Sequence, residues 1–185
     1  MTAAAVAAPA TELGAPLDDD IGNVSGVSLG SYAFQTYQSV YGPSTPGMGL
    51  TQVLTDAGAA ATPGMAALCL IGQNSELHAI AGPLVGQYLR DDPATTPPWA
   101  DILARNTPGS GSITVPLLVA QGESDVLVHP AATQQFVQQQ CAKGTHVIFK
   151  QFPDTGHGQI ALKAVPDILS LFAAARTGNP PPSTC

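Results

Sequence analysis

Two residues that could carry proton-transfer chemistry, Asp125 and His157, each follow a stretch with the pattern of a β-strand. Asp125 comes directly after the apolar run PLLVAQGES, and His157 follows IFKQFPDTG, 32 residues later. That separation fits one helix and one strand, which would bring both strand ends to the same edge of a parallel sheet. A carboxylate there can hold the Nδ1–H of an imidazole and leave Nε2 to take a proton from a serine hydroxyl. We therefore predict that Asp125 and His157 form an acid–base pair.

The other titratable residues fit these roles less well. Glu123 lies two residues too close to the strand, and Asp154 lies on the histidine's own loop. Of the remaining histidines, we expect a surface position for His129 and structural roles for His78 and His146.

A G-x-S-x-G motif at residues 26–30 offers Ser28 as a candidate nucleophile. In a nucleophile elbow, the serine sits on a strained turn between a buried strand and a helix. Here the preceding stretch is PLDDDIGNVS, which has three consecutive aspartates and no apolar run. We therefore expect Ser28 to be a helix residue. The order Ser28, Asp125, His157 nevertheless permits a catalytic role, so both interpretations stay open.

The chain changes character after about residue 110. Helical spacing and stop signals predict helices near 18–41, 50–60, 65–80, 83–89 and 99–106, after a short strand at 3–8. The last part alternates strand and helix, with strands near 115–120 and 146–152 and helices over 130–144 and 164–178. This order predicts a parallel sheet with right-handed crossovers.

Composition excludes several classes of function. The net charge is −7 with only six Lys and Arg, which argues against nucleic-acid binding. No apolar run approaches the ~20 residues of a membrane span. The N-terminal stretch MTAAAVAAPATELGAP has no basic region, so we interpret it as the start of folded protein rather than as a leader peptide. We predict no cofactor and no metal site.

Three cysteines are present, without C-x-x-C spacing. Cys141 and Cys185 can form a disulfide if the NPPPST tail folds back over the last helix, which leaves Cys69 free. A bond from Cys69 to either of the others would contradict this prediction. A disulfide would also indicate an exported protein.

The stretch VPLLVAQGESDVLVHPAATQQFVQQQCAKGTHVIFKQFPDTGHGQI resembles the C-terminal part of the secretory, lipase A-type lipases, which are α/β-hydrolases. Regions that come earlier in the sequences of the same family resemble two further stretches, AAAVAAPATELGAPL and GVSLGSYAFQTYQSVYG. The most specific pieces are G-x-x-D at 122–125 and G-H-G at 156–158. The resemblance implies a secreted Ser-His-Asp hydrolase of carboxylic esters or triacylglycerols, with Asp125 and His157 as its acid and base.

The resemblance also implies a domain organisation. Residues 1–14 would supply a strand of the hydrolase core, 15–110 a helical cap or lid, and 111–185 the last β-α-β-α part of a partial α/β parallel sheet. The family's nucleophile elbow would lie before Met1, so the chain is expected to be the C-terminal portion of such an enzyme. The alternative function is a non-catalytic fragment that binds acyl chains in an apolar cap groove. That groove would be lined by Phe34, Tyr37, Tyr41 and Leu50.

Overall fold

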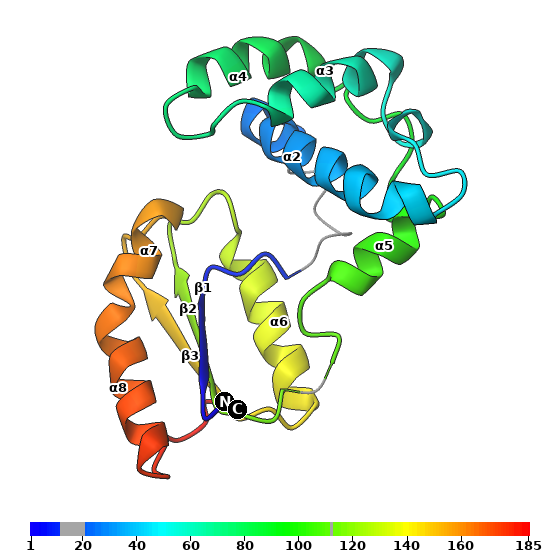
Figure 1. Cartoon of the computed structure of the whole chain (residues 1–185). Helices are drawn as coiled ribbons and strands as arrows, with labels where there is room; N and C mark the ends of the chain where they lie inside the picture. The colour runs from blue at the N-terminus through cyan, green and yellow to red at the C-terminus, as the bar shows by residue number, and fades with distance from the viewer. Residues whose placement is uncertain (12–20, 112) are drawn as a thin grey trace. The chain divides into compact units, whose positions relative to one another are not determined.

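The computed structural model describes residues 1–11, 21–111 and 113–185 (Figure 1). The chain divides into two compact units, one made of residues 1–12 and 108–185 and the other of residues 13–107. The first unit, called the sheet unit below, contains both ends of the chain. The second, called the helical unit, is formed by the segment between them.

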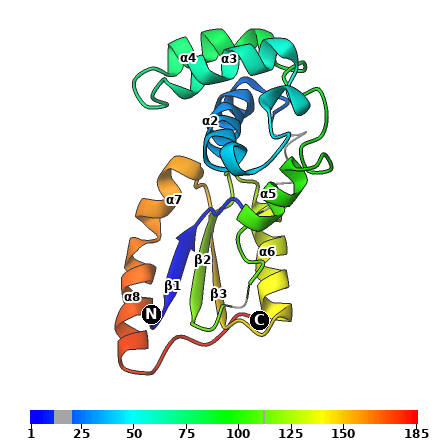
Figure 2. The ribbon, with the colours of Figure 1, turned by 45° about the vertical axis from the view of Figure 1, so that its right-hand side comes forward.

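The sheet unit is built on three parallel strands in the order β1 (Ala4–Ala7), β2 (Leu117–Gly122) and β3 (Val147–Phe152). Figure 2 shows the strands side by side, with α6 (Pro130–Ala142) on one side and α7 (His157–Lys163) and α8 (Val165–Arg176) on the other. The fold class is thus α/β with a partial parallel sheet, and the three expected strands are present.

Coverage of both faces explains the sequence of β2. All six of its residues, LLVAQG, are buried, because helices cover parallel strands on both faces. Leu118 and Ala120 pack in the cluster that includes Ile160 of α7 and Leu171 of α8. On the opposite face, β2 contributes to the cluster that contains Phe136 of α6.

The C-terminal tail covers the outer edge of β3. The Thr184 N–H donates to the Val147 carbonyl at 2.8 Å, and His146 Nε2 donates to the Pro181 carbonyl at 2.7 Å. The predicted Cys141–Cys185 disulfide is confirmed. Cys69 is free and exposed.

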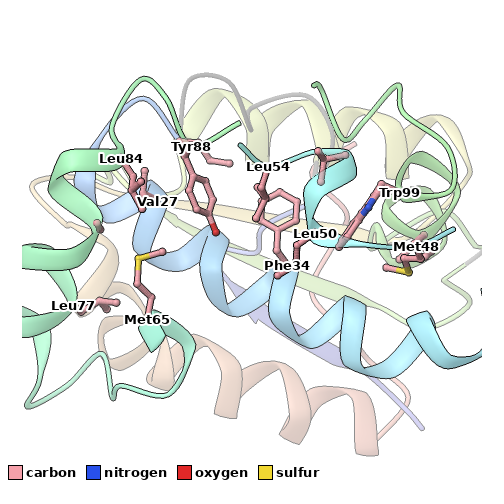
Figure 3. Packing of buried hydrophobic residues seen from close by; sticks show 14 residues of the cluster. Val27, Phe34, Met48, Leu50, Leu54, Met65, Leu77, Leu84, Tyr88 and Trp99 are labelled. Carbon is pink, nitrogen blue, oxygen red and sulfur yellow. The ribbon is translucent and has the colours of Figure 1, made fainter. Parts of the chain in front are cut away.

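The helical unit is organised around α2 (Val24–Tyr41), against which α3 (Asp56–Ala66) and α4 (Asn74–Ala81) pack. It also contains α5 (Trp99–Asn106) and the short 3-10 helices η1 (Gly42–Ser44), η2 (Leu50–Gln52) and η3 (Gly82–Leu84). Its core is aromatic at the centre (Figure 3): the Phe34 ring meets the Trp99 and Tyr88 rings edge-on at centroid distances of 5.4 and 6.1 Å.

The helices expected near 50–60 and 65–80 have different bounds in the structure. Helix α3 continues to Ala66, and α4 begins only at Asn74. The helix expected from residue 18 begins at Val24. Residues 18–20 lie outside the described residues, and the Asn23 side chain caps the helix by accepting a hydrogen bond from the Gly26 N–H at 3.0 Å.

The helix expected at 83–89 is wrong. Only η3 forms there. Gly86 then adopts φ +74°, which ends helical geometry, and Leu89 forms an isolated bridge with Leu54. In the opposite direction, α7 was not predicted, because its seven residues are too few to show a helical period.

No single helix in the described part of the chain is long and apolar enough to cross a membrane. By length and composition alone, α7 and α8 could do so as a pair bent by 41°.

Candidate active site

The site begins at the turn that follows β2. The Asp125 N–H donates to the Gly122 carbonyl at 3.3 Å, and the Ser124 N–H donates to the Thr155 carbonyl at 3.1 Å. The first bond closes the turn after β2, and the second ties this loop to the loop after β3. A Cβ added at Gly122 would lie only 2.2 Å from the Thr155 carbonyl oxygen, so a glycine is required at this crossing.

The Asp125 carboxylate is fully buried and held by the backbone. Its side chain has a relative exposure of 0%. Oδ1 accepts hydrogen bonds from the N–H groups of Leu127 and Val128, both at 2.9 Å. These bonds compensate for the loss of water around a buried charged group, which would otherwise be costly. Oδ2 is contacted by side chains instead.

His157 is the first residue of α7 and faces Asp125 Oδ2. Its Nδ1 lies 3.0 Å from Asp125 Oδ2. Because a carboxylate oxygen accepts, Nδ1 carries the proton and the lone pair of the neutral ring lies on Nε2. Nε2 makes no hydrogen bond to any described residue of this unit, and the side chain is 40% exposed. The imidazole is therefore held at Nδ1, and its Nε2 has no hydrogen bond within the described part of this unit. A general base requires such an arrangement.

The structure separates this pair from the rival residues. Glu123 is exposed, and its N–H pairs with the Phe152 carbonyl. Asp154 is exposed at a turn and adopts φ +49°. His129 is exposed at the start of α6, and His78 is half-buried within α4.

Ser28 lies inside helix α2. Five residues separate it from the preceding turn at Ile21–Gly22. Its side chain is buried, and its hydroxyl donates to the Val24 carbonyl at 2.8 Å, one helical turn earlier. A nucleophile elbow needs a turn directly between a strand and a helix. Ser28 has no such turn, and its hydroxyl proton is already engaged by the backbone.

The four residues expected to line an acyl groove belong instead to the core of the helical unit. Phe34 and Leu50 are buried in it, and Tyr37 and Tyr41 pack against it. The Tyr41 hydroxyl also donates to Asn106 Oδ1 at 3.1 Å. The acyl-groove interpretation is therefore not favoured.

Sequence reasoning missed Gln121, which lies on β2 and contacts Asp125. Its Nε2 lies 3.4 Å from Asp125 Oδ2. A signal was present, since Gln121 is the only polar side chain in the strand LLVAQG. The described residues contain no group of three or more His, Cys, Asp or Glu that could hold a metal ion.

The fold is that of α/β-hydrolases. Among solved structures, lipase A of Candida antarctica matches 99% of this chain with a TM-score of 0.66 and 19% identity. The rice cell wall degrading esterase LipA of Xanthomonas oryzae matches 94% with a TM-score of 0.64 and 22% identity. The chain spans less than half of those proteins, 43% of the first and 48% of the second. No protein-family model and no curated protein matches the chain.

Proposed function

We propose that this chain carries the general base and the orienting acid of a serine hydrolase that acts on carboxylic esters. The observation that carries this proposal is the 3.0 Å contact between Asp125 Oδ2 and His157 Nδ1 at the ends of two adjacent parallel strands. In the proposed reaction, His157 Nε2 takes the proton of a serine hydroxyl while the serine oxygen attacks the ester carbonyl. The imidazolium then gives that proton to the departing alkoxide, and Asp125 stabilises the positive charge on the ring.

We further propose that the nucleophile comes from a segment outside these 185 residues. Ser28 supports this view, because it lies in mid-helix with its hydroxyl bonded to the backbone. The outer edge of β1 supports it too. The N–H groups of Ala4 and Ala8 donate to the carbonyls of Pro116 and Ala120, so the alternate backbone groups of Ala5 and Ala7 point to the other side. No described strand pairs with that side.

The substrate class, the cap and the location complete the proposal. The two similar structures are named as a lipase and an esterase, which favours a lipase A-type enzyme of acyl esters or triacylglycerols. Residues 15–110 would form its helical cap or lid, between core segments 1–14 and 111–185. The Cys141–Cys185 disulfide favours a secreted protein. Low basic content disfavours a nucleic-acid partner. The chemistry needs no cofactor.

The test is hydrolysis of p-nitrophenyl butyrate by the protein in the longest form that its source produces, compared with the His157→Gln and His129→Gln variants. We expect the first variant to lose activity by at least about 10³-fold, in the range of other catalytic-triad members, and the second to keep it. Full activity in His157→Gln would overturn the proposal.

A fluorophosphonate probe then locates the nucleophile. We expect the labelled serine to lie outside residues 1–185 and the Ser28→Ala variant to be labelled as strongly as the wild type. A probe adduct on Ser28 would overturn the external nucleophile while leaving the ester-hydrolase proposal in place.

A further inference from the structure

Gln121 is a buried polar residue on a strand face that is otherwise apolar. Leu117 and Val119, which share its side of β2, belong to the cluster packed against α6. The Gln121 side chain has no exposure to solvent. An amide in this position destabilises the fold unless each of its polar atoms is hydrogen-bonded. Its contacts therefore show what it does.

The surroundings determine the orientation of the amide. The Thr133 hydroxyl, on α6, donates to Gln121 Oε1 at 2.7 Å. On the other side, Nε2 faces three oxygen atoms, which can only accept. These are the carbonyl oxygens of Gly122 at 3.1 Å and Val128 at 3.0 Å, and Asp125 Oδ2 at 3.4 Å. The NH₂ group must therefore point toward Asp125.

Gln121 reaches the carboxylate by two routes. One is the direct 3.4 Å contact of Nε2 with Oδ2, the oxygen that also accepts from His157 Nδ1. The other passes through the backbone of Val128. Gln121 Nε2 donates to the Val128 carbonyl, and the Val128 N–H donates to Asp125 Oδ1 at 2.9 Å. Gln121 thus acts on Oδ2 directly and on Oδ1 through the Val128 backbone.

We infer that Gln121, anchored by Thr133, is the positioning residue that directs the Asp125 carboxylate at His157 and thereby holds the histidine in its Nδ1–H tautomer. The catalytic role of Gln121 rests on the proposed function. The hydrogen-bonded arrangement of the four side chains is independent of that function, because it is a property of the folded chain alone. A continuous series of hydrogen bonds from α6 to α7 joins, in this order, Thr133, Gln121, Asp125 and His157.

The chain offers a matched control in Gln140. This second glutamine is also buried in the sheet unit, where it donates to the Gly109 carbonyl at 2.9 Å and accepts from the Thr145 hydroxyl at 3.2 Å. It therefore has the same kinds of partner as Gln121, a threonine hydroxyl and a backbone carbonyl. Only Gln121 contacts Asp125.

The experiment is long-range ¹H–¹⁵N NMR of the ¹⁵N-labelled 185-residue protein, which reports the tautomer of the neutral His157 ring. We expect the wild type and Gln140→Met to show the Nδ1–H tautomer as the major form. In Gln121→Met, we expect the major form to become Nε2–H. Retention of the Nδ1–H tautomer in Gln121→Met, or equal loss of it in Gln140→Met, would overturn the inference.

A second pair of variants keeps the test decisive if Gln121→Met does not fold. Thr133→Val removes the hydroxyl that anchors Gln121, and Thr133→Ser retains it. We expect partial loss of the Nδ1–H tautomer in the first and the wild-type tautomer in the second. Equal spectra for the two would contradict the anchoring role. A wild-type protein that shows this tautomer but no ester hydrolysis in its longest form would refute the proposed function and leave the positioning role intact.

Discussion

Asp125 and His157 are joined by a 3.0 Å contact in which the two side chains have opposite environments: the carboxylate is fully buried, whereas the imidazole is 40% exposed. The buried partner is held by two backbone N–H groups at Oδ1 and by the Gln121 amide at Oδ2. The exposed partner has its second ring nitrogen, Nε2, without a hydrogen bond to any described residue of the sheet unit. This asymmetry suits a base that is positioned by an acid which does not itself react.

Replacement of Asp125 with Asn should test that asymmetry directly. The amide keeps the size of the side chain but can present an N–H to His157 Nδ1, which favours the wrong tautomer. We expect an unchanged fold by circular dichroism and a loss of esterase activity of about 10⁴-fold in the longest natural form, as for the same change in other triads. Glu123→Gln, at an exposed carboxylate nearby, is the control and should stay active. A fully active Asp125→Asn protein would remove Asp125 from the site.

The crossing of the two loops at Gly122 leads to a second prediction. In Gly122→Ala, the new methyl group would meet the Thr155 carbonyl oxygen at 2.2 Å, so the loops carrying Asp125 and His157 must move apart. Overpacking of this kind destabilises a fold by about 1–3 kcal/mol. Gly158→Ala is the matched control, since a Cβ there meets nothing within 4 Å and lies in a helix. Urea unfolding of both variants measures the difference, and equal stabilities would show that the crossing is not tight.

The sequence was sufficient for the strand ends and the residues just beyond them. The short apolar run LLVA, which ends in a glycine turn, indicates a buried parallel strand, and topology then brings Asp125 and His157 to one edge. Helix α5 was also predicted with its observed bounds, Trp99–Asn106, because proline precedes it and a turn sequence follows it.

Long-range packing was not readable in the same way. In segment 83–89, Gly86 adopts φ +74° and the Tyr88 carbonyl accepts from the distant Thr55 N–H, so the chain leaves helical geometry after η3. The sequence does not distinguish core residues such as Phe34 and Leu50 from groove residues, because an apolar helix face has the same pattern whether it covers a core or binds a ligand. The role of Gln121 depends on Thr133, which is brought to it only by the β2–α6 crossover.

The Cys141–Cys185 disulfide should stabilise the sheet unit, since it closes a loop of 44 residues and fastens the tail that covers β3. The chain-entropy model gives about 4 kcal/mol for a loop of this length. We expect Cys185→Ser to lower the guanidinium unfolding midpoint accordingly. Cys69→Ser, at the free and exposed cysteine, should leave the midpoint unchanged. The opposite ranking of the two variants would mean that the tail adds nothing to stability.

The last prediction concerns Tyr88, whose hydroxyl lies in the core of the helical unit 2.7 Å from Thr62 Oγ1. Burial raises the pKa of Tyr88 to about 12, and the hydrogen bond with Thr62 lowers it only in part. The unfolded chain has a tyrosine pKa near 10 and therefore loses this proton first as the pH rises. The contribution of Tyr88 is fully present below about pH 10 and is lost as the pH approaches about 12, at up to about 1.4 kcal/mol per pH unit. Urea unfolding at about pH 9, 10 and 11 should show this loss in the wild type. Tyr88→Phe has no proton to lose at this position, so its stability should fall less steeply over the same range. Parallel curves for the two proteins would show that the Tyr88 hydroxyl titrates alike in the folded and unfolded states.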